Sequence, residues 1–326
     1  MNPTLAFLAA SLLSSPGTGQ DSRPGAESFR FNWPVPSEVR VSEKAIKKGR
    51  HAEMRYSVRL LRDSDGKHLR VQLRDFEFIK LAGMDVKDPR VRKALVQVMV
   101  LAQAIPDVQI DDKGVFVDII GIDKMVERIL EFIEKQTRDS DKGAQKPRTD
   151  AIRGILGNPS YRNAMKENVA NFWRAWVETW TMQTALPAGQ DIAVETSVPF
   201  FGGSQIQGAL TLRNHGPAPG TPGHVRLTAV GTMQGESMKK ALTGLFHKLA
   251  AQLPATGAKP FSADMLEVAK ATYRYEVVTR PATLQPKRAL LEKVITIKMK
   301  DQPARQEIER REYRFEWPVA GQSPGK

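Results

Sequence analysis

Two acidic residues beside a glycine, Asp63-Ser64-Asp65-Gly66, are the part of this sequence that most resembles a metal-binding motif. A helix–loop–helix calcium site needs glycine at its sixth position and glutamate at its twelfth. In this chain the glycine comes fourth, and Arg74 stands at the twelfth position. The flanking residues alternate between apolar and polar, which is typical of strands. We therefore interpret the segment as a β-hairpin turn.

The histidines do not form a metal-binding pattern either. They stand at positions 51, 68, 215, 224 and 247, and none belongs to a His-x-x-x-His or His-Glu-x-x-His arrangement. His215 and His224 flank a loop rich in proline and glycine, with no acidic residue near them. We expect exposed loop histidines and no bound metal or other cofactor.

Motifs for nucleophilic catalysis and nucleotide binding are missing from the sequence. Gly202-Gly203-Ser204 lacks the glycine two places after the serine that a nucleophile elbow requires. There is no dinucleotide-binding or phosphate-loop glycine pattern. The absence of cysteine excludes disulfides, thiolate catalysis and cysteine-based zinc sites. Catalysis is therefore not expected, and a hydrolase with a site assembled from scattered residues ranks third among the hypotheses.

The net charge of +13 raises the question of an anionic partner. Arg55, Arg59, Arg70 and Arg74 alternate with apolar residues in two strand-like segments, so we expect all four to project from one face of a hairpin. No aromatic residue shares this face between them, since Tyr56 falls on the opposite one, and this argues against nucleic acid. A solvated face and an anionic surface, such as lipid headgroups or acidic polysaccharide, remain the two interpretations.

Aromatic residues mark the candidate apolar site. Trp173, Trp176 and Trp180 are spaced three and four apart, so they share one face of a helix. That face packs under a sheet, lines an apolar cavity or contacts a membrane interface. With Phe31 and Phe315, these tryptophans are the candidate ligand contacts.

A seven-residue aromatic phrase occurs near both ends of the chain, as Phe29-Arg30-Phe31-Asn32-Trp33-Pro34-Val35 and Tyr313-Arg314-Phe315-Glu316-Trp317-Pro318-Val319. Alternation of aromatic and polar residues predicts a half-buried strand that stops at the proline in each copy. We expect the two strands to lie side by side, with Phe31, Trp33, Phe315 and Trp317 in one apolar layer.

The remaining pattern predicts an α+β fold. Hairpins are expected at 53–74 and 108–120 and helices at 88–104, 122–137, 150–181 and 236–252. Further strands are expected around 39–41 and at 190–200, 205–213, 223–233, 266–279, 288–300 and 305–317. A long, curved antiparallel sheet, open or partly closed, with several helices packed on it in two lobes, accounts for this order. The alternative is two separate α+β domains.

The division of the chain follows its composition. Residues 1–20 contain an apolar run followed by small residues, which is the layout of a signal peptide, although no Lys or Arg precedes the run. We expect a spacer at 21–28, an N-terminal lobe at 29–137, a linker at 138–149, a C-terminal lobe at 150–319 and a disordered tail at 320–326. No segment is long and apolar enough to span a membrane.

Three functional hypotheses follow. The first is an exported, non-catalytic protein, periplasmic or secreted, that binds an apolar or amphiphilic ligand between sheet and helices. The second is a structural envelope protein that docks on an anionic surface or partner through its basic face. The third is the hydrolase.

Overall fold

The computed structural model describes residues 29–138, 153–154, 156–181, 186–199, 205–236, 238–240, 242–244 and 265–318. The predicted signal peptide, spacer and tail lie outside these residues, as does the predicted linker beyond Arg138. In the described part of the chain, twelve strands form one sheet in the order β6-β5-β3-β2-β1-β12-β11-β10-β9-β8-β7, with β4 paired to β3. Neighbouring strands pair antiparallel. The sheet and its helices confirm the α+β class.

The elements fall close to the predicted ranges. The strands are β1 (Ser37–Lys47), β2 (Arg50–Arg62), β3 (Leu69–Leu81), β4 (Met84–Asp85), β5 (Asp107–Ile110), β6 (Phe116–Ile120), β7 (Asp191–Pro199), β8 (Gln205–Pro217), β9 (Val225–Gln234), β10 (Leu266–Thr279), β11 (Pro286–Met299) and β12 (Arg305–Glu316). The helices are η1 (Pro89–Val91), α1 (Arg92–Ala102), α2 (Ile122–Arg138), α4 (Pro159–Trp173), the π-helical turn η2 (Arg174–Glu178) and α5 (Thr179–Thr181). The predicted helix at 236–252 is described only in part.

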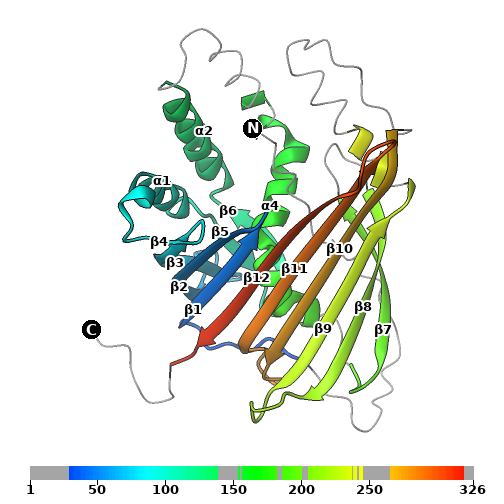
Figure 1. Cartoon of the computed structure of the whole chain (residues 1–326). Coiled ribbons are helices and arrows are strands. Elements are labelled where there is room, and N and C mark those ends of the chain that lie inside the picture. Colours follow the sequence, from blue (N-terminus) through cyan, green and yellow to red (C-terminus); the bar gives the residue numbers. More distant parts are fainter. Residues whose placement is uncertain are drawn as a thin grey trace.

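The first and last strands along the chain, β1 and β12, are neighbours in the middle of the sheet; β12 contains most of the second phrase, whereas β1 begins after the first. β1 pairs with β12 from Arg40↔Glu316 to Lys47↔Glu309. This pairing joins strands β6-β5-β3-β2-β1 to strands β12-β11-β10-β9-β8-β7, so one continuous sheet runs through both predicted lobes. In Figure 1 the long strands β9 to β12 lie in front and α4 lies behind them, while α1 and α2 stand at the β3–β6 end.

The first aromatic phrase is not a strand, which corrects the prediction. β1 begins only at Ser37, because Pro34 and Pro36 have no N–H to donate to a ladder. Residues 29–34 instead follow the β10–β11 turn. Arg30 N donates to Pro281 O (3.3 Å), and Asn32 N donates to Thr283 O (3.1 Å).

Both phrases nevertheless meet in one aromatic cluster. The Trp33 and Trp317 rings lie edge to face with centroids 4.8 Å apart, and Trp33 contacts Trp173 at 5.2 Å. Trp33 and Phe315 are buried, while Phe31 and Trp317 are partly buried against the same core. The expected apolar layer is therefore confirmed.

The continuous helical segment α4–η2–α5, which carries Trp173, Trp176 and Trp180 and is called the tryptophan helix below, supplies the other half of this cluster. Trp176 packs edge to face on Tyr313 and Phe315, with centroids 5.0 and 4.9 Å apart. All five residues of the π-helical turn η2 are buried. Within it, Arg174 Nε pairs with Glu178 Oε2 at 3.1 Å, and the guanidinium lies 4.9 Å above the Phe116 ring. The helical segment thus packs on the sheet through its rings, and it carries a buried arginine that pairs with both Glu178 and Glu167 of the same segment. Across the described helices, none has the length and apolar character needed to cross a membrane.

Gly114, in the β5–β6 turn, tests how tightly the first phrase packs. It has φ +82°, and an added Cβ would lie 2.7 Å from Phe31 Cγ. We expect Gly114→Ala to cost about 2–4 kcal/mol of unfolding free energy, since overpacking adds to left-handed strain. Gly121→Ala is the matched control, because Gly121 has φ +91° but its nearest neighbour is Pro106 Cβ at 3.9 Å. Urea denaturation measures both variants; equal losses would contradict the packing described.

Candidate functional site

A cavity of about 310 Å³ lies between the sheet and the helices α1 and α4. Its wall is mostly apolar, and four residues with charged or hydroxyl groups line it as well. The apolar lining residues are Met54, Leu73, Phe76, Phe78, Val98, Leu101, Ala102, Ile105 and Phe172, and the polar ones are Glu43, Tyr56, Arg311 and Tyr313.

Helix α1 forms one side of this cavity. It is preceded by the short helix η1, which Asp88 caps by accepting a hydrogen bond from Arg90 N at 2.9 Å, with Pro89 at its first position. Helix α1 itself follows Val91, which makes no side-chain capping bond. One face of α1 turns Val98 and Ala102 toward the cavity. The opposite face leaves Val96 61% exposed.

Along strand β12, the residues on the helix-facing side of the sheet change from aromatic to charged. Its inward positions change from Phe315 and Tyr313 to Arg311 and Glu309. Arg311 Nη2 donates to Glu309 Oε1 at 2.7 Å. On the side of β1, Arg311 Nη1 lies 3.4 Å from Glu43 Oε1.

Three further side chains extend these contacts. Tyr56 Oη donates to Glu43 Oε2 at 3.0 Å, and Lys47 Nζ lies 3.1 Å from Glu309 Oε2. Lys293 faces Glu309 from β11. We call Glu43, Tyr56, Lys47, Lys293, Glu309 and Arg311 the inner charge network.

Burial shifts the proton affinities of this network. It raises the pKa of Glu43 above its ordinary value, against the opposing effects of Arg311 and Tyr56. It also lowers the pKa of Lys293 from 10.5 to about 7, although Glu309 acts in the opposite direction. Glu309 itself has its pKa lowered to about 2, because Arg311 and Lys47 outweigh the effect of its burial. Charge on the inner face therefore depends on pH near neutrality.

The aromatic residues predicted as ligand contacts form packed core beside this cavity. Trp173 and Trp176 are fully buried, and Trp180 is 1% exposed. Phe31 contacts Trp173, and Phe315 contacts Trp176. None of these five residues lines the cavity. Phe172 connects the two regions, because it lines the cavity and its ring lies 4.8 Å from that of Trp176.

The predicted basic face is on the other side of the sheet. Arg55, Arg59, Arg70 and Arg74 alternate along β2 and β3 with residues of the core, so all four point away from the helices. Three of them are ion-paired: Arg59 with Asp75 at 2.7 Å, Arg74 with Asp107 at 2.6 Å, and Arg70 with Asp63. Arg55 forms no ion pair within the described residues.

The other sequence candidates take structural places. Asp63-Ser64-Asp65-Gly66 is the β2–β3 turn, where Gly66 N donates to Asp63 O at 3.0 Å. His215 is half-buried in β8 rather than exposed in a loop, and its Nε2 lies 2.9 Å from Thr228 Oγ1. Gly202-Gly203-Ser204 and His247 lie outside the described residues. Among the residues that are described, no His, Asp or Glu cluster could hold a metal ion.

The polar residues of the cavity were missed at the sequence level, although a signal for them exists. Glu43 continues the inward phase of Val39 and Val41, and Arg311 continues that of Tyr313 and Phe315. A charged residue in the apolar phase of a strand indicates a buried polar site. The alternation pattern of the two strands does not indicate which helix packs over these positions.

No protein-family model matches this sequence, and a search of curated proteins finds no match.

Lys293 provides a pH test of the inner charge network. Its pKa is about 7 in the folded protein and 10.5 ordinarily, so the unfolded chain binds more protons between these values. Stability should then rise with pH from about 7 to 9.5, by up to ~1.4 kcal/mol per pH unit. Below about pH 7, Lys293 is protonated in both the folded and the unfolded protein, so the folded state bears the full free-energy cost of burying its charge.

We expect Lys293→Met to remove this rise in unfolding free energy, measured by urea denaturation across the pH range. Lys298→Met is the control, because Lys298 lies on the same strand but its side chain is 37% exposed and pairs with Glu267. Parallel pH profiles for the wild type and Lys293→Met would show that Lys293 is not buried as described.

Proposed function

We propose that this protein is a non-catalytic binder of an amphiphilic ligand, which it holds in the cavity between α1 and the inner face of the sheet. The observation that carries the proposal is the composition of that cavity. Its walls come from apolar residues of β2, β3, α1 and α4, while Glu43 and Arg311 contribute charge from β1 and β12. Ligand sites are commonly apolar clefts with a few polar groups that fix orientation.

The volume supports a small ligand. About 310 Å³ is at the lower end of the range of about 300–1,000 Å³ that is typical for small-molecule sites. An apolar body of that size would replace water against Leu101, Phe76 and Phe172, and each buried methylene would contribute about 0.8 kcal/mol.

The charged residues favour a ligand with a polar head. The Arg311 side chain remains 42% exposed although it pairs with Glu43 and Glu309. Its guanidinium has five N–H donors, so it can bind a further oxygen. A purely apolar molecule would leave these groups facing hydrocarbon, which costs free energy.

We include in this proposal a partly closed, two-lobed shape for the sheet and an extracytoplasmic location for the protein. A sheet that curves around its helices as a partly closed, two-lobed shell would shield the apolar body of the ligand from water. The apolar run at 5–13 supports export, hence a periplasmic or secreted protein.

Filling the cavity should abolish binding. We expect Ala102→Phe to weaken the affinity for dansylated undecanoic acid at least tenfold, because the ring would occupy the ligand volume. Fluorescence titration measures the dissociation constant, with dodecanoic acid as the competitor. Val96→Phe is the matched control, since Val96 lies on the exposed face of the same helix, and it should bind like the wild type.

A second variant guards against misfolding. Arg311→Met keeps the cavity open but removes the charge that faces the head group. This variant should still bind a purely apolar probe, whereas its affinity for dansylated undecanoic acid should fall. Circular dichroism verifies the fold of each variant. A folded Ala102→Phe that binds like the wild type, or a wild type that binds neither probe, would overturn the proposal.

A further inference from the structure

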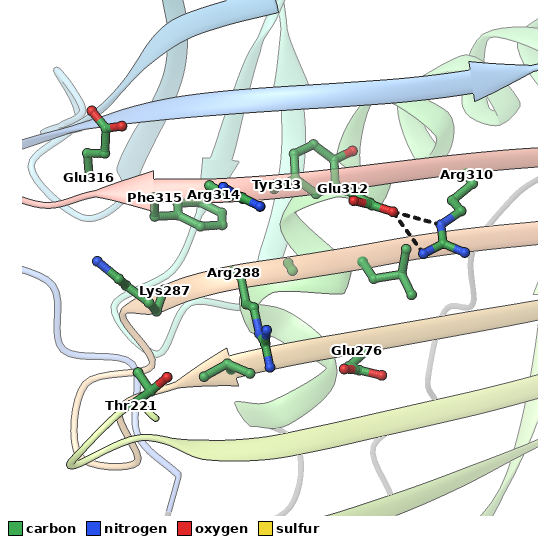
Figure 2. Close-up of a pocket in the computed structure, with 13 residues that line it drawn as sticks. Thr221, Glu276, Lys287, Arg288, Arg310, Glu312, Tyr313, Arg314, Phe315 and Glu316 are labelled. Atoms are coloured by element: carbon green, nitrogen blue, oxygen red, sulfur yellow. Dashed lines mark hydrogen bonds and ion pairs between the residues drawn. The ribbon is translucent and has the colours of Figure 1, made fainter. Parts of the chain in front are cut away.

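A groove of about 580 Å³ lies on the opposite face of the sheet, away from the helices. It crosses β10, β11 and β12, and Thr221 of the β8–β9 loop closes one end (Figure 2). Arg288 and Arg314 lie here at positions that alternate with the buried Ala289, Tyr313 and Phe315, so their side chains point outward.

Arg288 and Arg314 face each other directly across β11 and β12. The other charged residues that face each other between these strands have opposite signs, Glu292 with Arg310 and Lys293 with Glu309. Like charges directly opposite each other destabilise a sheet. On the flanking strands no acid lies directly opposite either arginine, because Arg314 faces Ser42 on β1 and Arg288 faces Val278 on β10.

Two of the three acidic groups that line the groove, Glu276 and Glu312, already pair with other arginines. Glu312 accepts a hydrogen bond from Arg310 Nε at 3.0 Å, which Figure 2 shows, and Glu276 accepts one from Arg274 Nη2 at 2.8 Å. Glu316 also lines the groove and faces Arg40 on β1. In the described part of the chain, neither Arg288 nor Arg314 forms an ion pair.

We propose that this groove binds a phosphate monoester, with the phosphate between the guanidinium groups of Arg288 and Arg314. Paired guanidinium forks match the oxygens of a phosphate and hold it by charge-assisted hydrogen bonds. Lys287 lines the same groove and is exposed, so it adds a third positive charge. The anion would also cancel the repulsion between the two arginines.

The remaining volume is larger than a phosphate, so the groove would also contact the group that carries it. This group could belong to a soluble ester or to the headgroup of phosphatidic acid, which present the same chemistry. The site is separate from the apolar cavity, because the two lie on opposite faces of the sheet.

Two probes distinguish these sources. Calorimetry with glycerol phosphate at constant ionic strength measures the soluble ester, and sedimentation with phosphatidylcholine vesicles that contain phosphatidic acid measures the lipid. We expect Arg288→Gln and Arg314→Gln each to weaken binding at least tenfold and to leave the protein as thermally stable as the wild type, since each relieves the like-charge contact.

Arg55→Gln is the matched control, because Arg55 lies on the same face outside the groove and forms no ion pair with any described residue; this variant should bind like the wild type. Binding of the soluble ester assigns the groove to small phosphate esters, and binding of the vesicles alone assigns it to the lipid headgroup. Absence of binding in both assays, or equal loss in Arg55→Gln, would overturn the proposal. Ala102→Phe should leave phosphate binding intact, so this test is independent of the apolar cavity.

Discussion

The pairing of β1 with β12 is the interaction on which the rest of the structure depends. It joins strands from the beginning and the end of the described chain into one sheet. Tyr313 and Phe315 of β12 receive Trp176 from the helix, and Trp33 and Trp317 meet beside them. Such aromatic pairs contribute about 0.5–1.5 kcal/mol each beyond the area they bury. The tryptophan helix is thereby fixed on the inner face.

The same pairing creates the polar part of the cavity. Glu43 comes from β1 and Arg311 from β12, and they form an ion pair only because these strands are neighbours. Buried charges are costly unless they are paired. The inner face therefore has a packed aromatic half and a charged half that borders the cavity.

Much of this fold is predictable from the sequence. Alternation located β2, the start of β3 and the last three strands within a few residues, although β3 continues to Leu81, beyond the predicted end at residue 74. The repeated phrase indicated that two segments far apart in the sequence lie close together, as Trp33 and Trp317 do. Alternation wrongly predicted a strand for the first phrase, because Arg30 and Asn32 donate their backbone hydrogen bonds to the distant β10–β11 turn and not to a neighbouring strand. The cavity was not predictable in detail, since its residues from α1, β1, β2, β3 and β12 are brought together only by the strand order. The tryptophans that suggested a ligand site are packed against one another instead.

The central claim is that an amphiphile occupies the cavity beside the inner charge network. Nuclear magnetic resonance of isotope-labelled methionine methyl groups tests it directly during titration with dodecanoic acid. Met54 lines the cavity, whereas Met265 and Met299 line a separate surface pocket. We predict intermolecular contacts between the acyl chain and the Met54 methyl group. Contacts at Met265 and Met299 alone, or no contact at any methionine, would contradict the account.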